Sequence, residues 1–452
     1  MNNELGVRDG RIWGRPNVNL TPDVLAELGA VLGTVIGEGS LVVTARDYYP
    51  PSRMLKRAFS SGLMSTGITV IDFHGATTPE LAFAIKRFGA KCGIQFTVSP
   101  YGEDTINVKF IDSNTAVFSR DKINNILELH RRRRIVRSLP YRIGWVSYAE
   151  YIHDIYVASV SGYLDTSVIR NFHPQVVVDH NFGPSDIIIP ELYSNMGVDL
   201  ISINAHRPPP RRGVRHLPPL KSLKRLSDIT LASDSLMGVA LCSDATRTLF
   251  IDEQGKIIDP DTITAIFLRG LPDGSTIVVS PFVSERVDIY ASKRRIRVYR
   301  TRSITSDIPR YIRRLRAVFG YSGRCEYIFP QFSYTPDANL AIGKMLEILG
   351  YLDVKLSHLV SEIPKLPVYE EKIKIEEKYL QRVIDNLFEA DEKSVSTING
   401  IKKIVNNQVV YVKVLDNLDG LKVGVEKPTN ASIDAVKRVT EEIERVLENI
   451  VR

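Results

Sequence analysis

Short apolar segments alternate with amphipathic segments through the first third of the chain. Leu41–Thr44 is apolar and rich in β-branched residues, which indicates a strand, and the apolar residues of Ser52–Ser65 recur at helical spacing. Ile68–Asp72 predicts the next strand, Thr78–Gly89 the next helix, and Gly93–Ser99 a third strand. Strands separated by helices of this length predict βαβ units and a largely parallel sheet.

The same cycle returns twice further along the chain. Gln175–Asp179 and Asp199–Ile203 read as strands of a second set, with a helix between them. Thr276–Ser280, Arg295–Tyr299 and Tyr327–Phe329 read as strands of a third set. The spacing therefore predicts three similar α/β domains with mixed, largely parallel sheets.

The last part of the chain has a different pattern. Val368–Leu387 is charged and helical in pattern, and Ile401–Val425 reads as strands with polar turns at Asn406-Asn407 and Asp419-Gly420. A final helix rich in Glu and Lys follows Ser432, so the tail is a small α+β domain. We expect four domains, with limits at residues 1–145, 146–250, 251–365 and 366–452.

Composition adds constraints on the class of protein. The chain has 452 residues, too many for one core, and 44% hydrophobic residues, as in ordinary globular proteins. We expect no membrane span and no secretory signal, and hence a cytoplasmic protein, because no long apolar run is present. Three widely spaced cysteines, Cys92, Cys242 and Cys325, indicate neither a disulfide framework nor a metal-ligand pattern.

The net charge of +7 comes from local basic runs, such as His130–Arg134 and Lys293–Arg302. Such runs could bind phosphate or a nucleic-acid backbone. They could equally form a solvated face whose arginine stems cover apolar surface. No nucleic-acid-binding motif accompanies them, which disfavours nucleic acid as a partner.

Several segments, in order, resemble one known family. Ala45–Ala58, which reads ARDYYPPSRMLKRA, and Gly62–Asp72, which reads GLMSTGITVID, match two of its scaffold segments, and Thr397–Lys402 matches the start of its last domain. In these residues the chain resembles the α-D-phosphohexomutases, the phosphoglucomutase/phosphomannomutase family. The resemblance implies a four-domain fold arranged around a central cleft, and a reaction that moves a phosphoryl group between the C1 and C6 oxygens of a hexose. That reaction uses a phosphoserine, a divalent cation, an acid or base, and donors for the distal phosphate.

The catalytic loop of the family, T-A-S-H-N-P, aligns with Thr97–Gly102. The resemblance makes Ser99 the candidate phosphoserine, and Lys109 matches a lysine a few residues further on. The family's histidine and asparagine are Pro100 and Tyr101 here, and proline offers neither a base nor an N–H donor. A serine after a strand is also a common loop residue.

The metal loop of the family, D-G-D-A-D-R, aligns with Cys242–Arg247, where Asp244 and Arg247 remain. Asp244 is the candidate metal ligand, and Arg247 a candidate phosphate contact. Mg²⁺ prefers charged oxygen ligands, so the loss of two carboxylates predicts weak or absent Mg²⁺ binding. Asp244 could alternatively cap a turn or pair with Arg247.

The sugar and phosphate loops have also changed. Tyr321–Glu326 stands where the family has G-E-x-S-G-H, and Arg324 is a candidate anion contact. Lys413–Leu418 stands where the family has R-P-S-G-T-E, which makes Lys413 and Asn417 candidate phosphate contacts. Trp13 replaces an arginine of the amino-terminal loop. Trp13, Tyr101, Tyr321 and Arg324 could stack on a flat ligand or simply fill their loops.

Changed loops on a retained scaffold predict a phosphohexomutase-family protein of carbohydrate metabolism with lost or strongly altered mutase activity. Its role would be phosphosugar binding, scaffolding or regulation, with a phosphorylated sugar, a nucleotide sugar or a protein as partner. One alternative is an active phosphosugar mutase, an intramolecular phosphotransferase that uses Ser99. Another is a basic protein that binds anions or nucleic acid.

Overall fold

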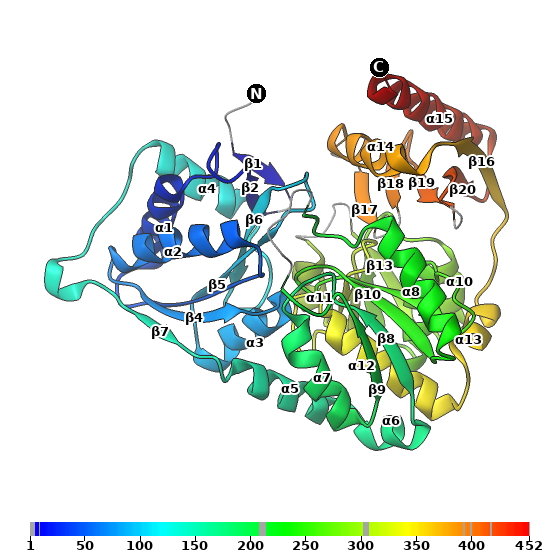
Figure 1. Cartoon of the computed structure of the whole chain (residues 1–452), viewed down its shortest axis with the longest axis horizontal. Helices are drawn as coiled ribbons and strands as arrows, with labels where there is room; N and C mark the ends of the chain where they lie inside the picture. Colours follow the sequence, from blue (N-terminus) through cyan, green and yellow to red (C-terminus); the bar gives the residue numbers. More distant parts are fainter. Residues whose placement is uncertain are drawn as a thin grey trace.

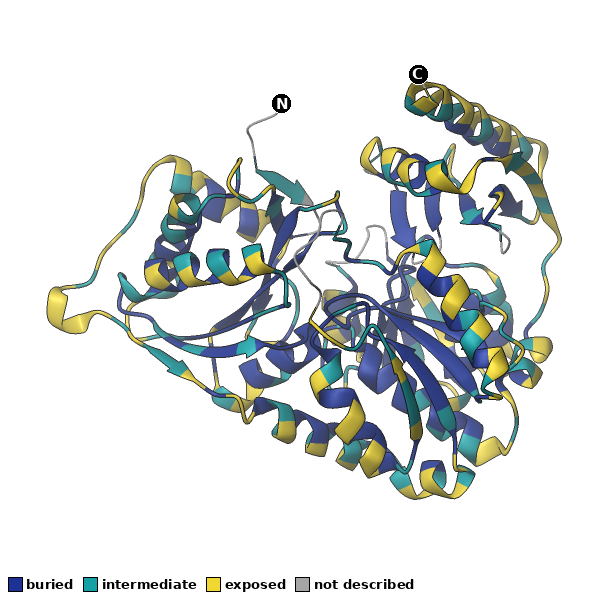
Figure 2. Cartoon of the chain, viewed as in Figure 1, coloured by how far each residue is buried: buried dark blue, intermediate teal, exposed yellow. Residues whose placement is uncertain are grey.

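The computed structural model describes residues 5–8, 10–207, 214–301, 307–391, 394–397, 400–415 and 418–451. These residues form four sheets, each covered by helices, that follow one another along an arc (Figure 1). The strands are largely buried and the outer faces of the helices are exposed (Figure 2). Among the described residues, no helix is both long enough and apolar enough to cross a membrane.

The first sheet has the strand order β1-β2-β6-β5-β3-β4-β7. Its strands are β1 (Gly6–Arg8), β2 (Arg11–Gly14), β3 (Leu41–Arg46), β4 (Thr69–Gly75), β5 (Cys92–Val98), β6 (Ile106–Asp112) and β7 (Val146–Tyr148). Its helices are α1 (Pro22–Ile36), α2 (Pro50–Met64), α3 (Thr78–Phe88) and α4 (Arg120–Arg131). β3 pairs in parallel with β4 and β5, and β6 pairs antiparallel with β5.

The second and third sheets repeat this central pattern. The second contains β8 (Gln175–Asp179), β9 (Asp199–Ile203), β10 (Met237–Leu241) and β11 (Thr248–Asp252), and the third β12 (Thr276–Val279), β13 (Arg297–Arg300), β14 (Phe319–Tyr321) and β15 (Tyr327–Ile328). In each, a central strand has two parallel neighbours, and one of those carries an antiparallel edge strand. The predicted triplicated α/β fold is therefore confirmed.

Nine helices and the single turn η2 (Leu268–Gly270) surround these two sheets among the described residues. The helices are α5 (Ile152–Tyr163), α6 (Thr166–Phe172), α7 (Ser185–Met196), α8 (Leu220–Ala232), α9 (Pro260–Phe267), α10 (Arg286–Lys293), α11 (Ile308–Leu315), α12 (Ala338–Leu352) and α13 (Leu356–Glu362), whereas the turn η1 (Pro140–Arg142) precedes β7 of the first sheet. One continuous apolar cluster, from Tyr156 to Ile363, packs the second and third sheets together. The domain limits stay a prediction.

The last sheet is antiparallel throughout, in the order β16-β20-β19-β18-β17. Its elements are β16 (Val368–Lys374), α14 (Glu377–Glu389), β17 (Ser394–Thr397), β18 (Gly400–Val405), β19 (Gln408–Val414), β20 (Gly420–Glu426) and α15 (Asn430–Val451). The α+β tail is confirmed, but the helix predicted over Val368–Leu387 is wrong in its first half. Val368–Lys374 alternates exposed and half-buried residues, which suits an edge strand beside β20.

Helices α1 and α2 approach each other through two glycines. A β-carbon at Gly62 would lie 1.9 Å from the carbonyl oxygen of Ala26, and one at Gly29 would lie 2.2 Å from that of Phe59. Both contacts are with backbone atoms, so the helices cannot absorb a side chain without separating.

We therefore expect Gly62→Ala to lower the free energy of unfolding by roughly 1–3 kcal/mol, because it overpacks this contact. The matched control is Gly162→Ala in α5, where a β-carbon would meet no atom within 4 Å. That change is expected to raise stability by about 0.5–1 kcal/mol. Urea unfolding of the three proteins measures both effects, and equal effects of the two substitutions would contradict the packing argument.

Candidate functional site

Ser99 lies directly after β5, at the start of the loop to β6, and its residue is 2% exposed. Its backbone N–H donates to the Thr105 carbonyl oxygen (2.8 Å), and its Oγ accepts a hydrogen bond from the Tyr101 N–H (3.0 Å). The side chain borders a cavity of about 40 Å³. Ligand pockets usually have roughly 300 Å³ or more, so this cavity is too small for a sugar phosphate.

Residues of the last sheet and its helix α14 close this cavity. Ile384 and Phe388 of α14 line it together with Ser396 of β17. The Phe388 ring stacks on Tyr101, with centroids 5.8 Å apart and planes 12° apart, and the ring centroids of Trp13 and Tyr101 are 5.6 Å apart. These rings therefore join the first and last units of the chain.

Tyr321 also packs against other residues of the protein interior. It is fully buried and stacks on Tyr327, with centroids 5.2 Å apart. Together with Tyr101, it is an aromatic residue that packs on the protein itself, as the loop-filling alternative expects.

Asp244 is the centre of a buried polar cluster in the loop between β10 and β11. Its Oδ2 accepts hydrogen bonds from the Lys109 ammonium and from Thr78 Oγ1 (2.8 Å). Its Oδ1 accepts from Cys242 Sγ (3.1 Å) and Thr246 Oγ1 (2.8 Å). The two oxygens thus face different partners: a cation on one side, a thiol and a hydroxyl on the other.

His216 completes this cluster. Its Nε2 lies 3.8 Å from Asp244 Oδ1, and its Nδ1 is 3.1 Å from Ser243 Oγ. His216 also lines the Ser99 cavity, so it connects the two parts of the site. No sequence pattern pointed to His216, because it lies in a proline-rich loop well before Cys242.

The environment fixes the charges of this cluster. Burial raises the pKa of Asp244, but the Lys109 charge and the surrounding groups together outweigh burial and hold that pKa well below its usual range. Burial raises the pKa of the Cys242 thiol to about 12 and lowers that of His216 to about 3. The thiol and the imidazole are therefore neutral. Burial also lowers the pKa of Lys109, and the Asp244 carboxylate opposes that shift, so the charged pair of the cluster is Lys109 with Asp244.

Arg247 is neutralised by a carboxylate from the third sheet unit. Its Nε lies 3.2 Å from Glu326 Oε1, and its Nη1 donates to Ser396 Oγ (3.2 Å). Burial raises the pKa of Glu326, and the charges of Arg247 and Arg324 lower it further than burial raises it. Both candidate anion contacts thus lie beside a buried carboxylate, and both are about 1% exposed.

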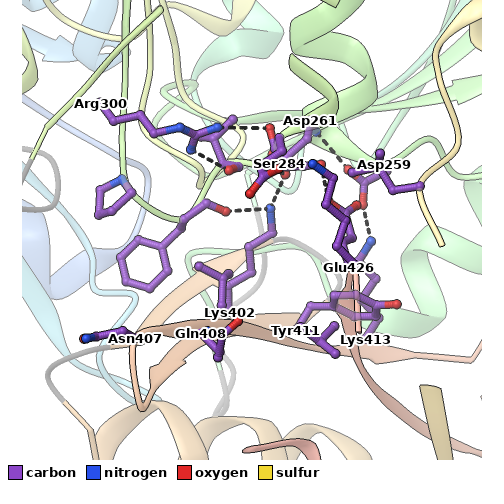
Figure 3. Close-up of a pocket in the computed structure, with 18 residues that line it drawn as sticks. Asp259, Asp261, Ser284, Arg300, Lys402, Asn407, Gln408, Tyr411, Lys413 and Glu426 are labelled. Carbon is purple, nitrogen blue, oxygen red and sulfur yellow. Dashed lines mark hydrogen bonds and ion pairs between the residues drawn. The ribbon is translucent and has the colours of Figure 1, made fainter. Parts of the chain in front are cut away.

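Lys413 lies in a different place, beside a larger cavity of about 270 Å³ between α9 and the last sheet. Figure 3 shows Lys402 and Lys413 reaching from that sheet toward Asp261 and Asp259. The Lys402 ammonium lies 2.5 Å from Asp261 Oδ2, and Lys413 bonds to Asp259. Asn417 lies outside the described residues.

The structure thus brings Ser99, Lys109, Asp244 and Arg247 to one region, with His216 and Ser396 as links. Lys413 is separated from them, because its ammonium points to the start of α9. Arg324, like Arg247, lies close enough to Glu326 to lower its pKa, but Arg324 does not line the Ser99 cavity.

Comparison with known proteins agrees with this architecture. Residues 6–134 match the model of phosphoglucomutase/phosphomannomutase α/β/α domain I, and residues 259–366 match the model of domain III. Together these matches cover more than half of the chain. The chain belongs to the α-D-phosphohexomutase family.

Relatives of this family resemble the chain over nearly its full length. The phosphoglucomutase/phosphomannomutase of Thermococcus kodakarensis is 28% identical over 411 residues, which cover 89% of this chain and 90% of that one. The phosphoglucosamine mutase of Methanocaldococcus jannaschii is 25% identical over 438 residues, covering 93% and 95%. A solved family protein from Burkholderia thailandensis superposes with a TM-score of 0.72 at 19% identity, covering 98% of this chain and 96% of that one.

The donor atoms around Asp244 do not fit the Mg²⁺ that the phosphohexomutase reaction uses. Mg²⁺ takes oxygen ligands in near-octahedral geometry. Here one carboxylate stands beside a neutral thiol and a hydroxyl, and a lysine ammonium already balances its charge. Lys109 thus places a fixed cation on the Oδ2 side of Asp244.

We expect Lys109→Met to lower the free energy of unfolding by about 3–5 kcal/mol, because it leaves the Asp244 carboxylate buried and unpaired. Adding Asp244→Asn to that variant should recover part of the loss, since the uncompensated charge disappears. The exposed pair Arg132–Glu128 is the control: Arg132→Met should change stability by less than about 0.5 kcal/mol. Additive single and double effects in urea unfolding would contradict a direct coupling of Lys109 to Asp244.

Proposed function

We propose that the chain binds a phosphorylated sugar and has lost, or strongly reduced, the mutase turnover of its family. The observation that carries this proposal is the Lys109 ammonium bound to Asp244, the one carboxylate retained from the metal loop. A mutase needs a cation that can contact the transferred phosphoryl group. Lys109 is 1% exposed and directed at a carboxylate, so it is poorly placed for that task.

The surroundings of Ser99 support the same proposal. Nucleophilic catalysis requires a base within hydrogen-bond reach of the hydroxyl. Pro100 follows Ser99 directly, and the Ser99 Oγ accepts a hydrogen bond from the Tyr101 N–H instead of donating to a base in the contacts described. His216 borders the same cavity, but a pKa of about 3 makes it a weak base near neutral pH.

The larger cavity is the proposed place for the phosphorylated sugar. Lys413 borders it and is 20% exposed, so its ammonium can meet a phosphate by exchanging Asp259 for the ligand. Tyr411 and Gln408 supply further polar groups for sugar hydroxyls, and the cavity of about 270 Å³ approaches the usual size of a ligand pocket.

The names of the relatives favour a second candidate, an active phosphosugar mutase. In that case Ser99 would be the nucleophile, Asp244 would hold a metal ion, and α14 would have to leave the Ser99 cavity. The two candidates differ in whether Ser99 ever carries a phosphate.

Turnover of hexose phosphates with Mg²⁺ and a hexose bisphosphate distinguishes them. We expect the wild type to show no more turnover than Ser99→Ala, and intact mass to show no phosphate on the protein. Turnover above that of Ser99→Ala, together with one added phosphate, would establish the mutase and refute the first candidate.

Ligand binding is measured separately by thermal shift with hexose phosphates. A ligand that binds the native state at a hundred times its Kd stabilises it by about 2.7 kcal/mol, so the melting temperature should rise. Lys413→Met should weaken binding at least about tenfold, whereas Lys221→Met, an exposed lysine on α8, should not. No shift with any hexose phosphate would rule out the proposed binding.

A further inference from the structure

Three potential metal ligands meet in the interior, and only Asp244 among them was a candidate ligand from the sequence. One ligand atom each of His216, Cys242 and Asp244 lies within 4.8 Å of the other two, and all three residues are buried. Cys242 and Asp244 come from the loop after β10, and His216 from the loop before α8. Cys242 is a free cysteine, so its sulfur is available for coordination.

We propose that His216, Cys242 and Asp244 form a binding site for a thiophilic divalent ion of the zinc class. This goes beyond the function proposed above, because it requires neither a sugar phosphate nor turnover. The site stands where relatives have a loop of three carboxylates, but its donors are of a different chemical kind.

The donor types select the metal. Zinc binds thiolate, imidazole and carboxylate at about 2.0–2.3 Å, commonly with four ligands, whereas Mg²⁺ prefers oxygen alone. Soft thiolate ligands discriminate strongly in favour of Zn²⁺ and related ions. A thiol within the loop, joined by an imidazole from a second loop, therefore changes which ion is preferred as well as weakening the Mg²⁺ site.

His216 gives independent support for a ligand at this place. Its Nε2 has no hydrogen-bond partner among the described residues, and the residue is 1% exposed. A buried polar atom without a partner is costly, so such an atom calls for an explanation. Nε2 points toward Asp244 Oδ1, while the contact of Nδ1 with Ser243 Oγ fixes the ring, as outer-shell partners of metal-bound histidines do.

The two carboxylate oxygens of Asp244 have different partners, so Lys109 and a metal ion do not compete for the same oxygen. Lys109 and Thr78 bind Oδ2, whereas Cys242 and His216 face Oδ1. A metal ion on the Oδ1 side therefore leaves the ion pair in place. Thr246 Oγ1, 2.8 Å from Oδ1, is close enough to supply a neutral fourth donor.

Binding has a defined proton balance. The Sγ–H bond of Cys242 breaks, a bond from Sγ to the metal forms, and the proton passes to solvent. Thiolate formation therefore releases a proton when the ion binds, and the affinity rises with pH.

Cobalt titration of the full chain, first stripped with a chelator, tests the proposal directly. We expect one Co²⁺ per chain, a near-ultraviolet thiolate-to-cobalt band, and displacement of that band by Zn²⁺ but not by Mg²⁺. Calorimetry in buffers of different ionisation enthalpy should show release of one proton. Absence of the thiolate band in the wild type, or its displacement by Mg²⁺, would overturn the proposal.

Variants then assign the ligands. Cys242→Ser should abolish the band, and His216→Gln should weaken Zn²⁺ binding at least about a hundredfold, more than typical outer-shell changes do. Cys92→Ala is the control, because Cys92 is also buried but lies in β5 and outside the cluster. A band that persists in Cys242→Ser refutes the assignment. If that variant does not fold, X-ray absorption of the zinc-loaded wild type decides, since the site requires one sulfur neighbour at about 2.3 Å.

Discussion

The buried ion pair between Lys109 and Asp244 is the contact on which the arrangement of the units depends. Lys109 comes from β6 of the first sheet, and Asp244 from the loop after β10 of the second. The same loop accepts the Thr78 N–H at the Asp244 carbonyl and the Ala338 N–H at the Ala245 carbonyl, and its Arg247 donates to Ser396 of the last sheet. One short loop thus contacts all four units.

This use of the loop explains why a charged pair is retained in the interior. Replacing a buried pair by apolar residues is often neutral or stabilising, whereas removing one partner is costly. The Asp244 carboxylate has its acceptor positions filled by Lys109, Thr78, Cys242 and Thr246, so its desolvation is offset by a network with satisfied partners. Asp244 therefore connects the second sheet unit to the first.

The fold followed from the sequence because strand and helix periodicities are local. Leu41–Thr44 and Gln175–Asp179 were predicted as strands, and they lie in β3 and β8. The error at Val368–Lys374 has a physical reason: an edge strand with alternating charges and a charged helix look alike without knowledge of β20 beside it. Contacts between segments distant in the sequence could not be predicted from these local periodicities. His216 meets Asp244, and Lys413 meets Asp259, only after the units have packed together.

Opening the Ser99 cavity and breaking the Lys109–Asp244 ion pair are separate events. To expose Ser99, α14 must withdraw, which separates Phe388 from Tyr101 and Asp385 from Arg215, whose atoms lie 2.6 Å apart. Neither contact involves Lys109 or Asp244, so the ion pair need not break when the cavity opens. The aromatic stack and the partly exposed Arg215 pair together are worth only a few kcal/mol. Opening the Ser99 cavity therefore costs little compared with displacing the buried lysine from its carboxylate.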